Sequence, residues 1–208
     1  GMDYVAIVPG MNMLYFTGLH MHLSERPIVL LFPAASDARP GIIVPGFEVG
    51  KAMSGPVKLD WQVFSYVDGV PYAQAFAQAA EAMQLDGKTI GVEPRAFRFL
   101  EYILFKQAAP AVNIVAADSV IGPLRMIKDA DEVAATRRAI QLTEQVLADV
   151  LEEVKEGQTE REIAGMLSAT AIRRGAHGVA FSPLVQIGLS AAFPHGNAGD
   201  RKLQAGDV

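Results

Sequence analysis

The feature that most constrains the fold is a change in the spacing of apolar residues near Pro71. Before Pro71, apolar residues gather in short runs, the length of buried β-strands. After it, further short runs alternate with segments in which apolar residues recur at helical spacing. An order of strand, helix, strand, helix, strand is typical of an α/β layer with partly parallel strands. The predicted fold class is therefore α/β, with a mixed sheet and flanking helices.

The first part of the chain contains six candidate strands and two candidate helices. The strands are expected at residues 3–8, 28–32, 41–44, 62–67, 89–92 and 112–116, and the helices at residues 71–86 and 97–109. The first four strands suit a meander or hairpin. The pattern then pauses at residues 118–123, and a domain boundary is predicted there, between residues 2–121 and residues 122–208.

Two capping boxes mark the start of two helices in the second part. Asp129 is followed by Glu132, and Thr159 by Glu162, and each pair precedes apolar residues at helical spacing. The apolar stripe of the first helix consists of Val133, Thr136, Ile140, Thr143, Leu147, Val150 and Val154, before Gly157. We therefore expect two antiparallel helices, followed by a strand at residues 181–188.

Composition excludes several classes of function. A net charge of −5, with no run of Lys or Arg, does not suit a nucleic-acid or anionic-membrane surface. The absence of cysteine excludes disulfides, thiolate metal sites and a cysteine nucleophile. The apolar runs are far shorter than the roughly 20 residues of a membrane helix. No charged segment followed by an apolar one opens the chain, so a cytoplasmic protein is expected.

Five segments in a fixed order then indicate a family. They are residues 12–18 (Asn-Met-Leu-Tyr-Phe-Thr-Gly), 91–93 (Gly-Val-Glu), 124–132 (Leu-Arg-Met-Ile-Lys-Asp-Ala-Asp-Glu), 157–162 (Gly-Gln-Thr-Glu-Arg-Glu), and 181–196, ending in Pro-His-Gly. Together they resemble the creatinase, prolidase and aminopeptidase P family, peptidase family M24. The resemblance implies a creatinase-type N-terminal domain over residues 2–121. It also implies an incomplete pita-bread α+β domain over residues 122–208, truncated before the metal ligands.

The resemblance also implies an activity for the intact protein. It would be a metal-dependent Xaa-Pro dipeptidase or aminopeptidase that hydrolyses the bond before proline in small peptides. Two divalent metal ions, often manganese, would be held by two aspartates, one histidine and two glutamates beyond residue 208. No metal ligand is assigned within this chain, which is expected to be inactive by itself. A homodimer is also expected, because half a catalytic domain would expose apolar surface.

The resemblance assigns one catalytic-domain residue of this chain, His195. It matches the family histidine that faces the substrate, where imidazole can donate a hydrogen bond or move a proton near neutral pH. By itself, a loop histidine beside Pro and Gly is more often merely exposed. Phe181 is a weaker substrate-binding candidate, and a core position suits it equally. His20 and His22, two residues apart, are weak candidates for the substrate rim, although a solvent-facing role suits them better.

Three alternatives stay open. The first is a creatinase-like amidinohydrolase, which needs no metal and would use the same histidine as acid and base. The second is a non-catalytic pita-bread protein that binds peptides or proteins. The third is a unit for dimerisation and folding only. A serine hydrolase is weakly supported, because Ser182 and Ser190 lack a Gly-x-Ser-x-Gly elbow.

Overall fold

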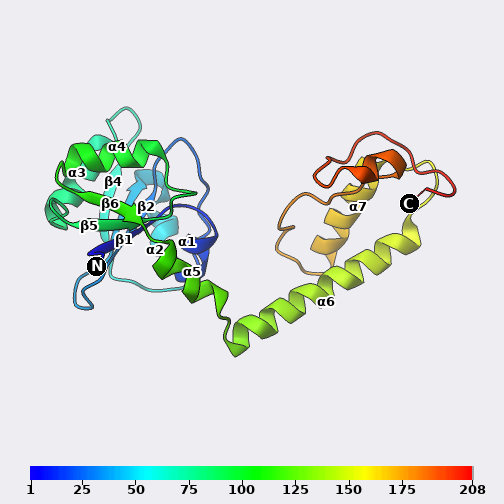
Figure 1. Ribbon diagram of the computed structural model, residues 1–208, viewed down its shortest axis with the longest axis horizontal. Coiled ribbons are helices and arrows are strands. Elements are labelled where there is room, and N and C mark those ends of the chain that lie inside the picture. Colours follow the sequence, from blue (N-terminus) through cyan, green and yellow to red (C-terminus); the bar gives the residue numbers. More distant parts are fainter. Residues whose placement is uncertain (208) are drawn as a thin grey trace. The chain divides into compact units, whose positions relative to one another are not determined.

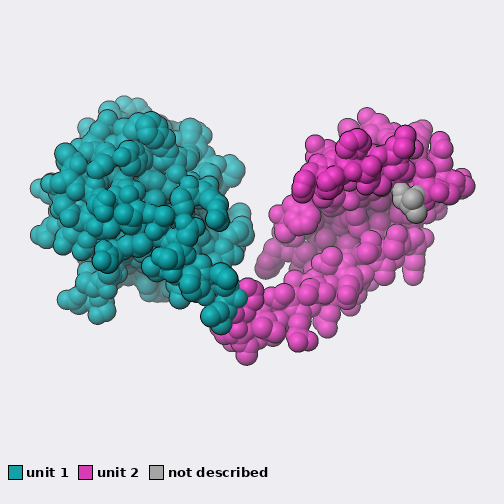
Figure 2. Space-filling view, in the orientation of Figure 1, with its two compact units in different colours: residues 1–127 teal, residues 128–208 magenta. Residues whose placement is uncertain are grey.

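The computed structural model describes residues 1–207. It divides into two compact units, residues 1–127 and residues 128–208 (Figure 2). The division follows Ile127, whereas the boundary predicted between residues 121 and 122 falls inside helix α5, Asp118–Met126. Each unit is described by itself below.

Unit 1 contains a mixed six-stranded sheet in the order β4-β3-β2-β1-β5-β6 (Figure 1). The strands are β1 Tyr4–Ile7, β2 Val29–Pro33, β3 Gly41–Pro45, β4 Gln62–Tyr66, β5 Thr89–Val92 and β6 Asn113–Ala116. β2 is antiparallel to β1 and to β3, and the remaining neighbours are parallel. The α/β class and all six predicted strands of this unit are confirmed. The first four strands are not a simple meander, because β3 and β4 are parallel.

Helices cover both faces of the sheet. α3 (Ala73–Ala82) and α4 (Phe99–Ala108) contribute to one core, while α1 (Met11–Thr17), α2 (Val49–Met53) and α5 contribute to the other. Successive strand residues point to opposite faces. In β2, Val29 and Leu31 therefore belong to the first core and Leu30 to the second, and all three are fully buried. Burial on both faces explains why these strands read as continuous apolar runs.

Three helices of unit 1 were not predicted from the sequence. α1 and α2 have seven and five residues, too few to show a helical repeat, and the 3-10 turn η1 (Gly46–Glu48) precedes α2. α5 occupies residues 118–126, where the sequence pattern pauses because the segment contains Gly122 and Pro123. Proline and glycine normally weaken a helix interior. Here Ile121 packs into the second core, so tertiary burial overrides that preference.

Unit 2 begins with the two predicted helices, α6 (Ala130–Glu153) and α7 (Glu160–Arg173), which pack against each other. Both capping boxes are confirmed. The Glu132 amide donates to Asp129 Oδ1 over 2.8 Å, and the Glu162 amide donates to Thr159 Oγ1 over 3.1 Å. Each cap satisfies backbone donors that the first turn of a helix leaves unpaired.

Two expectations for unit 2 are wrong. Residues 181–187 form no strand, and the chain instead turns into η2, a 3-10 helix at Gly188–Ala192. A strand needs a partner, and the described residues of this unit contain no sheet. The expected stripe of α6 is also largely exposed, including Ile140 and Leu147. Only the end of α6, at Val146 and Val150, is buried, because the shorter α7 does not cover its beginning.

Among residues 1–207, no helix combines the length and the apolar character needed to cross a membrane. The longest one, α6, carries charged residues along its length.

Candidate functional site

His195 lies on a loop of unit 2 that contains η2 and continues to Gly199. We call residues 187–199 the histidine loop. The His195 side chain is exposed, and Ile187 at the start of the loop is buried in the small core of unit 2. A histidine exposed on an anchored loop can reach a ligand without first losing an internal partner.

The histidine loop is held by the buried carboxylate of Glu160, the first residue of α7. Its Oε1 accepts hydrogen bonds from the Ile187 amide, over 2.9 Å, and from the Ser190 hydroxyl. Its Oε2 accepts from the Gly199 amide over 2.7 Å. One side chain therefore binds the loop on both sides of His195.

The backbone of α7 adds a second attachment just after the loop's histidine. The Glu160 amide donates to the carbonyl of Arg201 over 3.1 Å, and the Arg161 amide donates to the carbonyl of Gly199 over 3.1 Å. These two amides are among those that the first turn of a helix cannot pair internally. The first turn of α7 thus binds the end of the histidine loop, and Arg201 just beyond it, through backbone hydrogen bonds.

Hydrogen bonding lowers the pKa of Glu160 below its ordinary value. The Ser190 hydroxyl contributes most, followed by the amides of Gly199 and Ile187, and the charge of Arg201 acts in the same direction. Burial opposes them by disfavouring the charged form, but it is the weaker influence. The carboxylate is therefore ionised at neutral pH, as its role as an acceptor requires.

Acid is expected to release the histidine loop. A carboxyl group whose folded pKa lies below its unfolded value stabilises the fold above the unfolded value, and that contribution disappears as pH falls through the folded pKa. For Glu160 the loss should therefore occur below its ordinary value of 4.5. The test is the amide chemical shift of Gly199 by NMR during an acid titration, with Glu160→Gln as the control that removes the inflection. An inflection above 4.5 would contradict the expectation.

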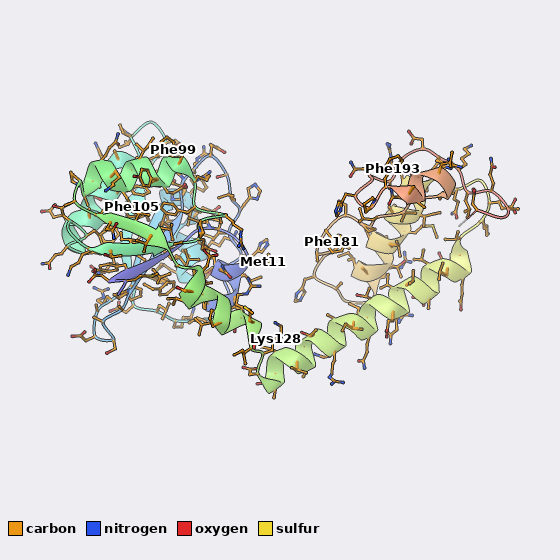
Figure 3. All side chains as sticks on the ribbon, viewed as in Figure 1. Met11, Phe99, Phe105, Lys128, Phe181 and Phe193 are labelled. Atoms are coloured by element: carbon orange, nitrogen blue, oxygen red, sulfur yellow. The ribbon has the colours of Figure 1, made fainter. Side chains whose placement is uncertain are left out.

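Phe181 occupies a different part of unit 2. It lies on the segment that follows α7 (Figure 3). Its side chain is 72% exposed and lines an apolar hollow of about 950 Å³, together with residues of α6 and of the end of α7. His177 also lines this hollow, whereas His195 is not among its lining residues within the described chain. The role of Phe181 as a substrate contact stays a prediction.

His20 and His22 belong to unit 1. Both side chains are exposed, whereas Met21 between them is only 5% exposed, as expected for an extended segment with both histidines on one face. The segment is attached to α4 nearby, where the Arg98 guanidinium donates to the carbonyl of Ser24. Their contact with a substrate stays a prediction.

The acidic and histidine side chains of residues 1–207 do not form a metal site. No group of three or more such residues lies in an arrangement that could hold an ion. The donor set present in the described chain therefore does not fit a pair of divalent metals. The cluster of Glu152, Glu153 and Glu156 is exposed to solvent, as expected for the end of a helix.

Glu160 is the residue that sequence reasoning overlooked. In the sequence it is one residue of the segment 157–162 that precedes and begins α7, where an acidic residue usually lies in solvent and interacts with the helix dipole. Its burial, with 2% of its surface exposed, depends on residues 27 and 39 positions further along the chain. Ser190, considered above as a nucleophile, contacts this carboxylate through its hydroxyl. No local sequence signal distinguishes Glu160 from an ordinary first-turn glutamate.

Comparison with known families gives matches over both units. The Creatinase/Prolidase N-terminal domain matches residues 1–127, and Metallopeptidase family M24 matches residues 134–208. An uncharacterised peptidase of Staphylococcus aureus is 26% identical over an alignment of 208 positions, which covers 99% of this chain and 55% of that protein. These matches confirm the resemblance that the ordered segments indicated.

Solved structures agree with these matches. A dipeptidase from Mycobacterium ulcerans is 29% identical with a TM-score of 0.80, and 100% of this chain covers 54% of that one. A recombinant prolidase from Thermococcus sibiricus is 25% identical with a TM-score of 0.89, and 100% of this chain covers 55% of it. The chain thus spans about half the length of the relatives it matches.

Proposed function

The chain belongs to the creatinase/prolidase and M24 metallopeptidase family, and we propose that it forms part of a metal-dependent peptidase that hydrolyses the bond before proline in small peptides. In this proposal, residues 2–121 are the creatinase-type domain and residues 122–208 begin the catalytic domain. The similarity to a prolidase and a dipeptidase supports the substrate class. A homodimer remains part of the proposal.

The observation that carries the proposal is the exposed imidazole of His195 on a loop that Glu160 holds on both sides. An imidazole held in this way can donate a hydrogen bond to the scissile carbonyl, where negative charge develops during hydrolysis. Imidazole is also a side chain that can transfer a proton near neutral pH. Phe181, His20 and His22 are secondary candidates for contacts with the substrate.

The proposed function also requires metal ions, for which residues 1–207 offer no group of three or more ligands. Family members of this kind use two divalent ions, often manganese, which activate water and polarise a carbonyl group. The described residues hold no group suited to such ions, so no step is assigned to a metal that they bind. What this chain contributes is the placement of His195.

The polypeptide of residues 1–208 is therefore expected to release no amino acid from Xaa-Pro dipeptides in Mn²⁺, because residues 1–207 contain no group of three or more side chains suited to a metal ion. The measurement is chromatographic detection of free proline over long incubation. A longer form of the protein, with the length of its relatives, is the positive control. Turnover by residues 1–208 that His195→Ala abolishes would overturn the expectation.

A further inference from the structure

Glu160 occupies an unusual position for an acidic side chain. It opens a helix of 14 residues, yet only 2% of its surface is exposed. Burying a carboxylate is costly unless hydrogen bonds compensate for the lost water. The role of Glu160 must therefore account for the three hydrogen-bond donors that its buried carboxylate accepts from.

All three donors come from the histidine loop. The amides of Ile187 and Gly199 approach from opposite ends of the loop, and the hydroxyl of Ser190 approaches from η2. Two carboxylate oxygens thus fix the segment before His195 and the segment after it. Hydrogen bonds to an ionised acceptor are the strong kind, and this geometry uses both oxygens.

The backbone near the carboxylate is shaped for this contact. A Cβ atom added at Gly199 would lie 3.3 Å from Glu160 Oε2, so a larger residue would crowd the shortest backbone contact of the carboxylate. Ser190 is fixed in turn, because the Gln186 side-chain amide donates to its carbonyl over 2.7 Å. The conformation of the histidine loop therefore depends on hydrogen bonds to one side chain of α7, that of Glu160.

We propose that Glu160 is a positioning residue, which holds the histidine loop and thereby sets the direction of the His195 imidazole for catalysis. It acts through the loop and touches no reacting atom. The role of His195 that it serves is the one given under the proposed function, and this inference rests on it. The attachment of the loop, by contrast, can be tested without any substrate.

The test compares Glu160→Gln and Glu160→Ala with the unchanged 208-residue chain by NMR. Glutamine keeps one acceptor oxygen but turns an NH₂ group toward one of the donors. Alanine removes the three hydrogen bonds to the carboxylate and leaves the two backbone bonds of Glu160 and Arg161 in place. Hydrogen exchange of the Ile187 or Gly199 amide should become about 10- to 100-fold faster, as expected for the loss of bonds to a charged group. The backbone order parameter at His195 should fall from about 0.85 to below about 0.6.

Glu162→Gln is the matched control. Glu162 lies in the same turn of α7, but within residues 1–207 its carboxylate accepts hydrogen bonds only from the amide and hydroxyl of Thr159. It therefore caps the helix without holding the loop. The control should leave the order parameter at His195 unchanged. Equal loosening of His195 in Glu162→Gln, or a rigid His195 in both Glu160 variants, would overturn the inference.

Activity assays separate this inference from the proposed function. In the longer form of the protein, Glu160→Gln should lower kcat about tenfold or more, with little change in KM, and should add nothing in a His195→Ala background. If His195→Ala alone leaves activity intact, the proposed function fails while the NMR result on the loop still stands. If Glu160→Gln lowers activity equally with and without His195, the positioning role is wrong.

Discussion

Replacing His195 with alanine in a form of the protein as long as its relatives is expected to lower kcat/KM for Xaa-Pro dipeptides by about 10²- to 10⁴-fold. This is the range typical of a lost general acid or base, and an oxyanion donor contributes similarly. The loss should appear mainly in kcat, because the bond to the carbonyl oxygen strengthens as charge develops. Steady-state kinetics with a saturating divalent metal provides the measurement.

Two further variants make this prediction specific. His195→Gln keeps a hydrogen-bond donor but cannot transfer a proton near neutral pH, so partial activity would indicate hydrogen bonding as the larger contribution. His177→Ala is the matched control, since His177 is also an exposed loop histidine of unit 2 and lines the apolar hollow. Equal losses for His177→Ala and His195→Ala would contradict the assignment.

Phe105→Ala is expected to lower the free energy of unfolding of unit 1 by about 3–5 kcal/mol, the usual cost of removing a buried phenylalanine side chain. Phe105, a residue of α4, is fully buried in the first core of unit 1. Its ring centroid lies 5.0 Å from that of Phe76, edge to face, and 6.1 Å from that of Phe97. Urea unfolding can be followed by the fluorescence of Trp61, the one tryptophan of the chain, which lies in the same unit.

The same helix supplies the control. Phe99 at the start of α4 is 73% exposed, so Phe99→Ala should change the free energy of unfolding by no more than about 0.5 kcal/mol (Figure 3). If Phe105→Ala does not fold, Phe105→Leu should still be measurably less stable than Phe99→Ala. Equal stabilities for the variants at the two positions would contradict the assigned core.

Much of unit 1 could be predicted because its signals are local. Each strand is a continuous apolar run, as in residues 28–32, and α3 has apolar residues at helical spacing. The capping boxes at Asp129 and Thr159 located two further helix starts, since a cap requires only residues three positions apart. The family could likewise be identified from five sequence segments, because their residues and their order along the chain are visible without a structure.

The missed elements depend on tertiary burial. α5 forms despite Pro123 because Ile121 has a core to enter. Residues 181–187 carry a strand-like composition but remain without a strand, because no partner lies beside them in the described unit. In both cases tertiary packing overrides the local preference: α5 has a core to pack against, whereas residues 181–187 have no neighbouring strand in the described unit.

The sequence by itself determined the α/β class, the strands of unit 1, the two capped helices and His195 as the candidate residue. Only the tertiary structure decided that His195 lies on a loop fastened at both ends, and that Glu160 fastens it. The reason is physical: a capping glutamate acts within one turn of helix, whereas Glu160 accepts hydrogen bonds from Ile187 and Gly199, 27 and 39 residues away. Such contacts exist only once the chain has folded back onto the start of α7.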